Sequence, residues 1–439
     1  MQPKKVVIMG AAGRDFHNFN VLFRGSESHR VVAFTATQIP DIEGRVYPPQ
    51  LAGPGYPDGI PIRPEDELEA IVREQDVDEV WFSYSDVTLA YVMEVGSRVI
   101  GWGAHFGVCS ATRTMLASSR PVIAITAVRT GVGKSQTSRY LARVLKKLGL
   151  KAVAIRHPMP YGDLSRQVCQ RFATYEDLDR HDCTIEEREE YEPHIDAGFV
   201  VYAGVDYEQI LRRAEQEAEV ILWDGGNNDT SFLRPDLQIT LVDPHRPGHE
   251  LSYYPGYTNF LTAHLLIVNK VNTAETENVE RVLANCRRHN PGARVLQCAS
   301  KITVENPELI RGKRALVVED GPTLTHGGMT YGAGWVAARQ AGASEIVSPV
   351  DYAVGSIKAT YEHYPNARQI LPAMGYGEAQ IRELEATIDA TPADVVVEGT
   401  PIDLSRVLKV GKPIANVRYE LEELDPGVIE ECVRKVVER

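Results

Sequence analysis

The stretch between Val122 and Gly149 restricts the fold of this chain more than any other part of its sequence. It begins with the apolar run Val122–Ile125, which is typical of a short buried strand, and continues into the motif TGVGKS at Thr130–Ser135. Apolar residues then recur at the three- and four-residue spacing of an amphipathic helix. A strand, a glycine turn and a helix form a phosphate-binding loop, because the glycines let backbone N–H groups point inward and the helix N-terminus adds partial positive charge.

Two positions of this loop carry most of its expected chemistry. Lys134 is expected to reach the β- and γ-phosphates of a nucleotide, and the Ser135 hydroxyl is expected to ligate Mg²⁺. The usual pattern begins with glycine, whereas this chain has Val128, and in this form the loop resembles that of dethiobiotin synthetase and its relatives. Arg129 stands where the partition-type ATPases of the same superfamily carry a second lysine. The other positions predicted to bind the nucleotide are Thr130, Gly131, Val132, Gly133 and Gln136.

Length, charge and cysteine content narrow the class of protein. A chain of 439 residues is expected to form two or three domains. The net charge of −13 argues against binding of nucleic acid, which needs clustered Lys and Arg. No apolar run is long enough for a membrane span or a signal peptide, and the six cysteines form no CxxC pair, as expected of a cytoplasmic protein with reduced thiols.

The distribution of predicted strands divides the chain into three α/β parts. We expect a Rossmann-like domain at 1–118, a P-loop NTPase domain with a parallel-sheet core at 119–312, and a C-terminal α/β domain at 313–439. In the first domain, the strand Lys5–Met9 runs into a GxxG turn, but a third glycine and an acidic residue after the second strand are missing. Three alternatives remain open there: a dinucleotide site, a site for another anion at Arg14 and His17, or a unit without a ligand.

Polar residues follow the strands that come after the loop. The strand Val220–Trp223 leads to Asp224, expected to hold Mg²⁺ through water, and to Gly226, whose N–H group is expected to contact the γ-phosphate. The strand Ala152–Ile155 leads to Arg156 and His157. Ligands of parallel sheets lie beyond the carboxyl ends of the strands, so this basic pair is expected either near the phosphates or on a solvated turn.

The residues that follow two further predicted strands suggest contacts with the substrate and with the base of the nucleotide. Residues 237–242 precede His245, Arg246 and His249, which indicate an anion clamp or a salt-bridged loop, with either histidine as acid or base. The loop after residues 265–268 resembles the guanine-reading NKxD motif.

In that loop, Asn269 and Lys270 are expected to flank the base. Asn272 replaces the aspartate, which leaves the choice between ATP and GTP open. The loop with His326 is predicted to be either another phosphate cradle or a structural turn. The final helix is expected to be capped by Asp425, with Pro426 in its first turn.

Six motifs together resemble the family of cyclic 2,3-diphosphoglycerate synthetase and its bacterial and archaeal relatives labelled predicted GTPases. They are GAAGRDFHNF (10–19), TAVRTGVGKSQTSRY (126–140), RHPMPYGDL (156–164), WDGGNND (223–229), VDPHRPGHE (242–250) and EDGPTLTHGG (319–328). The resemblance implies an enzyme that uses Mg²⁺ and ATP or GTP to activate a phosphorylated carboxylic acid through an anhydride.

On this interpretation the catalytic residues are Lys134, Arg129, Asp224 and His245, and the residues that hold the acid are Arg156, His157, Arg246, His249 and His326. Expected partners are the nucleotide and a small anionic substrate, in a homo-oligomer.

The main alternative is a nucleotide-dependent switch or metal-delivery NTPase that acts on a partner protein. Its potential metal ligands, His181, Asp182, Cys183 and His194, lie in a charged insertion at 163–197, which is otherwise expected to be a solvated helical face or a cover over the active site. A regulatory module without turnover is disfavoured, because the Mg²⁺ ligands Ser135 and Asp224 are both present.

Overall fold

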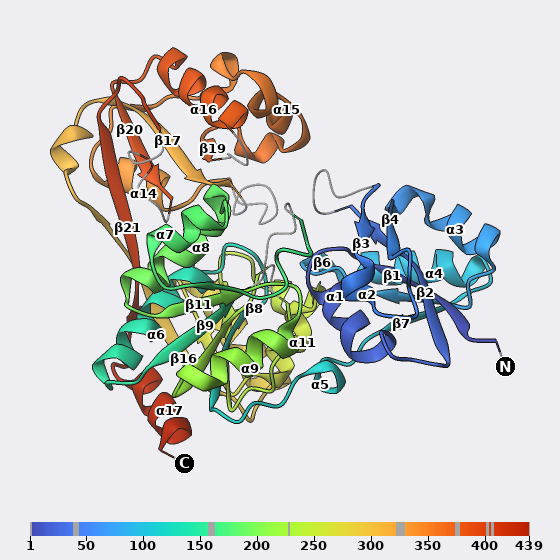
Figure 1. Cartoon of the computed structure of the whole chain (residues 1–439). Coiled ribbons are helices and arrows are strands. Elements are labelled where there is room, and N and C mark those ends of the chain that lie inside the picture. The colour runs from blue at the N-terminus through green and yellow to red at the C-terminus, as the bar shows by residue number, and fades with distance from the viewer. Residues whose placement is uncertain are drawn as a thin grey trace.

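The computed structural model describes residues 2–37, 44–156, 163–226, 229–321, 330–373, 378–400, 404 and 408–438. It is a multidomain α/β structure, as the sequence predicts, with two main sheets. The N-terminal part stands beside the rest of the molecule (Figure 1). Among the residues described, none of the helices combines the length and the apolar character that a bilayer crossing requires.

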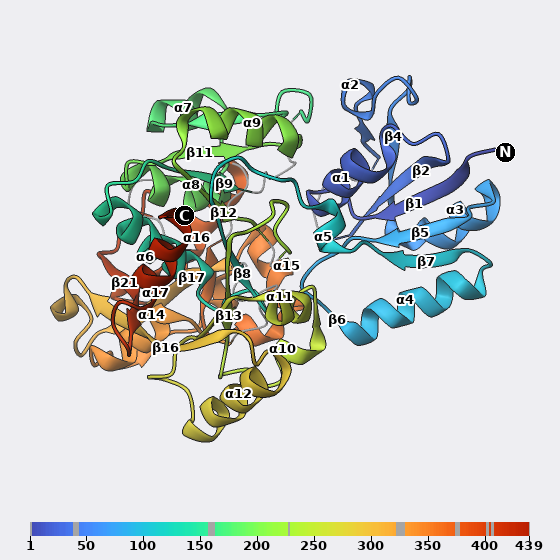
Figure 2. The ribbon, with the colours of Figure 1, turned by 90° about the horizontal axis from the view of Figure 1, so that it is seen from below.

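The N-terminal unit is a six-stranded sheet of order β3-β4-β2-β1-β5-β7, in which only β3 is antiparallel to its neighbour. The chain moves outward from β1 to one side and then, with β5 and β7, to the other, so the strand order reverses between β1 and β5. In the view from below, its helices cover both faces of the sheet (Figure 2). Its elements are β1 (Lys4–Met9), α1 (Arg14–Asn18), β2 (His29–Ala36), β3 (Val46–Tyr47), α2 (Pro49–Ala52), β4 (Ile60–Pro64), α3 (Leu68–Gln75), β5 (Glu79–Phe82), β6 (Val87–Thr88), α4 (Leu89–Gly101), β7 (His105–Val108) and α5 (Ala111–Thr114).

The central unit carries the predicted phosphate loop between β8 and α6, as the strand and helix pattern indicates. Its parallel strands have the order β11-β9-β12-β8-β13-β15-β16, with β10 antiparallel at the edge. The elements are β8 (Val122–Ala127), α6 (Lys134–Lys147), β9 (Ala152–Arg156), β10 (Gln170–Phe172), α7 (Tyr175–Arg180), α8 (Ile185–Asp196), β11 (Val200–Ala203), α9 (Tyr207–Glu217), β12 (Val220–Asp224), β13 (Leu237–Val242), α10 (His249–Ser252), β14 (Tyr253–Tyr254), α11 (Gly256–Thr262), β15 (Leu265–Val268), α12 (Thr276–His289) and β16 (Arg294–Val304).

The third part continues the same sheet through β16. The first half of β16 is parallel to β15, and its second half is antiparallel to β21, beyond which β20, β17 and β18 follow. Its elements are β17 (Arg314–Asp320), α14 (Ala333–Gln340), β18 (Glu345–Ile346), α15 (Gly355–His363), β19 (Leu371–Ala373), α16 (Glu378–Ala390), β20 (Val395–Gly399), β21 (Ile414–Glu423) and α17 (Val428–Val437).

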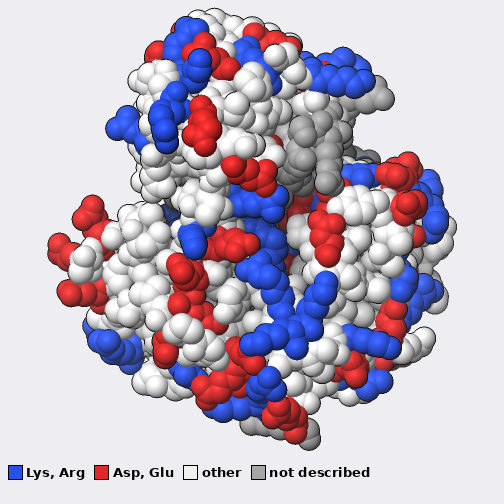
Figure 3. Space-filling model, turned by 90° about the vertical axis from the view of Figure 1, so that its left-hand side faces the viewer, with Lys and Arg blue, Asp and Glu red and all other residues white. Residues whose placement is uncertain are grey.

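The end of the chain returns to the central unit. Apolar residues of β21 and α17, among them Leu421, Ile429 and Val433, belong to the same buried cluster as Ile123 and Ile125 of β8. Ion pairs support this return from α6: Lys147 binds Glu430 at 2.7 Å, and Arg143 binds Glu420 at 3.4 Å. Figure 3 shows acidic and basic side chains interspersed over one face, with a column of Lys and Arg down its middle.

The cap expected for α17 is wrong by two residues. The helix begins at Val428 after Gly427, which has the positive φ of 90° that glycine tolerates. The Glu423 carboxylate accepts hydrogen bonds from the N–H groups of Val428 (2.8 Å) and Ile429 (3.4 Å), so a residue of the preceding strand satisfies the free helix donors.

Candidate functional site

The loop between β8 and α6 has the geometry of a phosphate cradle. Gly131 and Gly133 have φ angles of 79° and 112°, and a Cβ at Gly133 would lie 2.2 Å from the amide nitrogen of Asn269. Glycine is therefore required there both by the backbone angle and by the close approach. The side chain of Gln136 is buried and accepts a hydrogen bond from Ser300 at 3.1 Å, so it supports the loop from below.

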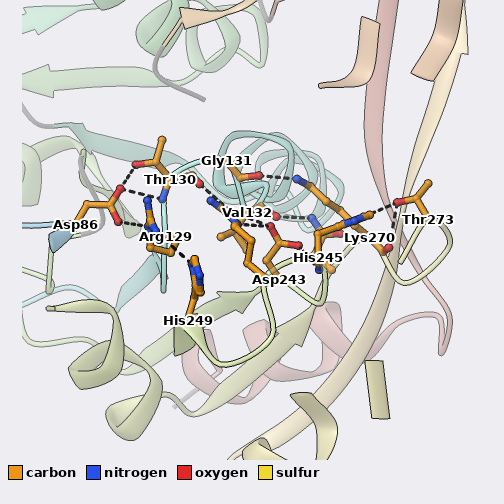
Figure 4. Close-up of polar contacts among 12 residues, drawn as sticks. Asp86, Arg129, Thr130, Gly131, Val132, Asp243, His245, His249, Lys270 and Thr273 are labelled. Carbon is orange, nitrogen blue, oxygen red and sulfur yellow. Dashed lines mark hydrogen bonds and ion pairs between the residues drawn. The ribbon is translucent and has the colours of Figure 1, made fainter. Parts of the chain in front are cut away.

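Three side chains hold the carbonyl groups of this loop on the side of β13 and β15. Asn269 donates to the carbonyl of Val132 at 2.8 Å, and Lys270 donates to that of Gly131 at 2.6 Å (Figure 4). Arg246 donates to the carbonyl of Thr130 at 2.8 Å. A loop whose carbonyls are fixed in this way can turn N–H groups toward phosphate oxygens.

The two residues expected to flank the base, Asn269 and Lys270, contact the phosphate loop in this structure, and their role at the base stays a prediction. The polar ends of Asn269 and Lys270 bind the phosphate loop itself. Asn272 donates to the carbonyl of Ser300 at 3.1 Å and accepts from its N–H at 3.0 Å, so its amide is fixed on β16. Both amide atoms of Asn272 are taken by main chain, which argues against a contact between Asn272 and the base.

Asp224 at the end of β12 is the centre of a buried ion-pair network. Its carboxylate binds Lys134 at 2.7 Å, Arg156 at 2.5 Å and His194 at 3.2 Å, and its side chain is 2% exposed. Burial alone would raise the pKa of Asp224, but Arg156 and Lys134 outweigh burial and hold that pKa well below its usual range. The carboxylate is consequently ionised at neutral pH and able to attract Mg²⁺.

Helix α8 of the charged insertion covers this network. Glu190 binds Arg156 at 2.5 Å, and His194, one turn later, is buried against Asp224. The insertion is thus a cover over the phosphate site, which was one of the two alternatives from the sequence. Among the described residues, no group of three or more His, Cys, Asp or Glu side chains is arranged to hold a metal ion.

Hydroxyl and carboxylate oxygens are the protein ligands that suit Mg²⁺ beside nucleotide phosphates. Ser135 lies exposed in the first turn of α6, and Asp224 follows β12, which is hydrogen-bonded to β8. Both oxygens of Asp224 are engaged by cationic or imidazole groups, which favours contact with the ion through water. These two residues therefore fit the metal role predicted for them.

The basic residues of the predicted anion clamp after β13 are paired with an acidic residue of the same loop. Asp243 is buried, accepts from Arg246 at 2.8 Å, and accepts from the N–H of His245 at 3.0 Å. The ring of His245 contacts the hydroxyl of Thr273 at 2.9 Å, and burial lowers the pKa of His245. The geometry is closer to the salt-bridged loop, the other alternative for this segment.

His249 is neutral at physiological pH. Arg129 donates to its Nδ1 at 3.2 Å, and because a guanidinium only donates, Nδ1 carries no proton. Burial and the neighbouring Arg129 lower the pKa of His249 to about 4. His157 and His326, also predicted for this site, lie outside the described residues, whereas Gly226 is described and accepts from the N–H of Asp229.

One important residue of the site, Asp86, comes from the N-terminal unit and was missed by the sequence reasoning. Asp86 binds Arg129 at 2.7 Å and accepts from the N–H (3.2 Å) and the hydroxyl (2.6 Å) of Thr130. The next residues form β6, which pairs with β14 and so brings the two units together. The sequence carried a signal for Asp86, because it is a polar residue just beyond the predicted strand at Val80–Ser83. The rule that ligands lie beyond the carboxyl ends of parallel strands therefore holds in the N-terminal unit as well as in the central one.

The turn after β1 is filled by the chain's own carboxylate. Asp15 accepts from the N–H groups of Ala12 and Phe16, both at 2.7 Å, and a Cβ at Gly10 would lie 2.4 Å from it. These are donors that a phosphate would need, so the dinucleotide and anion alternatives do not fit this turn. The unit without a ligand at this turn is the alternative that fits.

Arg14 and His17 connect the N-terminal unit to the central one. Arg14 is buried, donates to Thr230 and lies 4.0 Å above the ring of Phe232. The ring of His17 stacks on Phe232 with 4.5 Å between centroids, and burial lowers its pKa to about 3. Their positions suit packing between the two units rather than binding of an anion.

Comparison with known proteins identifies the family. The arginine synthetase ArcE of Thermococcus kodakarensis is 61% identical over 432 residues, which are 98% of this chain and 96% of that protein. The chain belongs to the arginine synthetase ArcE family. No family model matches it. With its phosphate loop, Lys134 and Asp224, this member of the family is a nucleoside-triphosphate-dependent ligase.

Two solved structures share a low similarity with the chain. LpxK of Aquifex aeolicus, crystallised in complex with ATP, has a TM-score of 0.45 and 12% identity, and the alignment covers 79% of this chain and 96% of that one. The cell division protein MinD of Aquifex aeolicus has a TM-score of 0.23 and 16% identity, over 40% of this chain and 81% of that one. Both TM-scores lie below 0.5, and neither likeness bears on the function.

Proposed function

We propose that this ligase uses ATP and Mg²⁺ to form arginine by phosphoryl activation of the ureido group of citrulline. The observation that carries the proposal is the 61% identity to a named arginine synthetase over nearly the whole of both chains. The phosphate loop with Lys134 and Ser135, and Asp224 beside it, supports phosphoryl transfer as the source of driving force.

The structure of arginine indicates citrulline as its precursor. Arginine carries nitrogen at the one position where its ureido analogue citrulline carries oxygen, and oxygen is a poor leaving group until it is phosphorylated. In the first step the ureido oxygen attacks the γ-phosphorus of ATP, and the bond to ADP breaks. In the second step ammonia attacks the central carbon, the C–O bond breaks and phosphate leaves, so that arginine, ADP and phosphate form in equal amounts.

The residues of the site have defined roles in these steps. Lys134 and Arg129 neutralise charge that develops on the transferring group, and such preorganised charges are usually the largest catalytic contribution. Ser135 directly and Asp224 through water would hold Mg²⁺, which supplies further charge neutralisation at the phosphates when bound. Ammonia gives up a proton once it has attacked, and the departing phosphate accepts it.

A phosphorylated carboxylic acid of the 2,3-diphosphoglycerate type is the second candidate acceptor, and the six sequence motifs favour it. Two of the basic residues expected to hold such an acid are already paired with carboxylates, however. Arg156 is paired with Asp224 and Glu190, and Arg246 is paired with Asp243.

The proposal is tested by product analysis with both acceptors. The purified protein is incubated with Mg²⁺, ATP or GTP, and either citrulline with ¹⁵N-ammonium or 2,3-diphosphoglycerate. We expect one ¹⁵N in arginine, measured by mass spectrometry, for each ADP and phosphate released, with ATP used at least as well as GTP.

A phosphorus NMR signal of an anhydride only with the diphosphoglycerate would overturn the proposal in favour of the second acceptor. Nucleotide hydrolysis that neither acceptor stimulates would instead favour the switch or metal-delivery NTPase.

A further inference from the structure

Helix α8 turns one apolar strip and one polar strip toward the molecule. Tyr191 and Ile195 pack in an apolar cluster with residues of β9 and β11, which anchors the helix on the sheet. Glu190 and His194 each come one residue earlier, and because they are four residues apart they share a neighbouring strip of the helix surface. That strip contacts the ion pairs around Asp224.

His194 is a buried residue whose ring has a single polar contact in the described part of the chain. Its side chain is 3% exposed, and its Nε2 lies 3.2 Å from Oδ2 of Asp224. A carboxylate only accepts, so Nε2 donates this hydrogen bond. The other ring nitrogen, Nδ1, has no hydrogen-bond partner among the described residues. Burial of a polar ring is unfavourable without hydrogen bonds, so the bond to Asp224 is the contact that orients this ring.

The donors around Asp224 are divided unequally between its two carboxylate oxygens. Oδ2 is bound by Arg156 at 2.5 Å and by His194 at 3.2 Å, and the side chains of these two donors are 4% and 3% exposed. Within the described residues, Oδ1 has one ion-pair partner, Lys134 at 2.7 Å. Lys134 is also the residue expected to contact the phosphates, so Oδ1 is the oxygen that can be given over to the water shell of Mg²⁺.

We infer that His194 is a positioning residue for Mg²⁺: it fixes Oδ2 of Asp224 and thereby keeps Oδ1 turned toward Lys134 and the phosphate loop. The inference rests on the part of the proposed function that assigns Mg²⁺ to Ser135 and Asp224. A carboxylate that is held at one oxygen cannot rotate freely, which keeps its other oxygen in place for the ion. Removal of a group that orients a metal-binding side chain typically lowers metal affinity about 10- to 100-fold.

The test compares full-length wild type with His194→Met by calorimetry of ADP binding, once in excess Mg²⁺ and once in excess EDTA. Because metal and nucleotide binding are linked, the ratio of the two dissociation constants measures how much the metal strengthens the complex. We expect this ratio to fall about tenfold in His194→Met, while the Kd in EDTA stays within about twofold of wild type. ADP permits no turnover and needs no acceptor, so the result is independent of the acceptor.

Arg188→Met, on the same helix, is the matched control. Arg188 binds Asp179 of α7 and, at 3.5 Å, Glu192, so its replacement loosens α8 at the surface and leaves the imidazole in place. This variant should keep the wild-type ratio. His194→Gln should also keep most of it, because its amide N–H reaches about as far as Nε2, whereas the shorter His194→Asn should behave like His194→Met.

Other outcomes would overturn the inference. If His194→Met weakens ADP binding as much in EDTA as in Mg²⁺, the residue only packs the cover over the site. An equal loss in Arg188→Met would mean that attachment of α8, rather than the imidazole, is what matters. Should His194→Met not fold, equal ratios in His194→Gln and His194→Asn would refute the positioning role. If Mg²⁺ does not strengthen ADP binding to the wild type, the metal assignment of the proposed function fails first.

Discussion

Replacement of Asp229 by asparagine should stabilise the chain, and more so at alkaline than at acidic pH. Asp229 is 5% exposed, and its pKa of about 7 compares with 3.8 for an ordinary aspartate. Burial is the main cause, because a desolvated carboxylate resists ionisation. Asparagine has the same shape, keeps an acceptor oxygen for Ser85, and never ionises.

The sign and size follow from the two pKa values. Below pH 3.8 the carboxyl is protonated in both states and costs nothing. Between 3.8 and 7 the unfolded chain ionises while the folded chain stays protonated, so stability falls as pH rises; above 7 both are ionised and the loss is constant. With 1.36 kcal/mol for each unit of pKa, the loss is about 1.5 kcal/mol at pH 5 and about 4 kcal/mol at pH 8.

Urea unfolding of wild type and Asp229→Asn at pH 5, 6, 7 and 8 measures this difference. The variant should gain about 2.5 kcal/mol relative to wild type across the series. Asp394→Asn is the control with the opposite sign: a hydrogen bond and ion pair with Arg314 lower the pKa of Asp394, so that variant should be less stable by a constant amount over this range. An advantage of Asp229→Asn that shrinks toward pH 8 would show that Arg14 stabilises the ionised carboxylate more than burial destabilises it.

Three further changes test the nucleotide site. Lys134→Ala should abolish turnover with the fold intact, and more than about a tenth of wild-type activity, a loss below about 1.4 kcal/mol, would contradict its assignment. Asn272→Asp should leave the ratio of ATP to GTP use unchanged and lower stability by about 1–3 kcal/mol, because the carboxylate cannot donate to the Ser300 carbonyl; a shift toward GTP in competition assays would restore the base-reading role. Arg156→Met should destabilise by about 3 kcal/mol in urea unfolding, since Asp224 loses a buried partner, and a neutral result would mean that Lys134 alone suffices.

Local patterns predicted the elements that lie close together in sequence. The strand, glycine turn and helix of the phosphate loop are confirmed at Val122–Ala127 and Lys134–Lys147, because turn glycines and helical spacing act over a few residues. The position of Asp224 at the end of a buried strand was predictable for the same reason. Parallel strand order then brought Arg156 to Asp224, which the carboxyl-end rule anticipates.

Contacts between distant segments were not predictable from such patterns. Asp86 reaches Thr130 only because β6 and β14, far apart in sequence, form a two-stranded sheet. The contacts of Asn269 and Lys270 with the carbonyls of Val132 and Gly131 could not be predicted from their motif, which specifies residue types but not side-chain direction. The prediction that Asp425 caps α17 was wrong for a related reason. The N–H groups at the start of the helix are bound by Glu423, and this contact depends on how β21 leads into the helix.

The Asp224 network also explains how a nucleotide can enter without exposing a bare buried charge. Lys134 is held by Asp224 at 2.7 Å in this structure, and under the proposed function it would exchange this contact for the phosphates. Arg156 keeps its own contact at 2.5 Å, so Asp224 stays ionised and in place after that exchange. Since Glu190 and His194 of α8 bind Arg156 and Asp224, the cover helix and the phosphate loop share one set of charges.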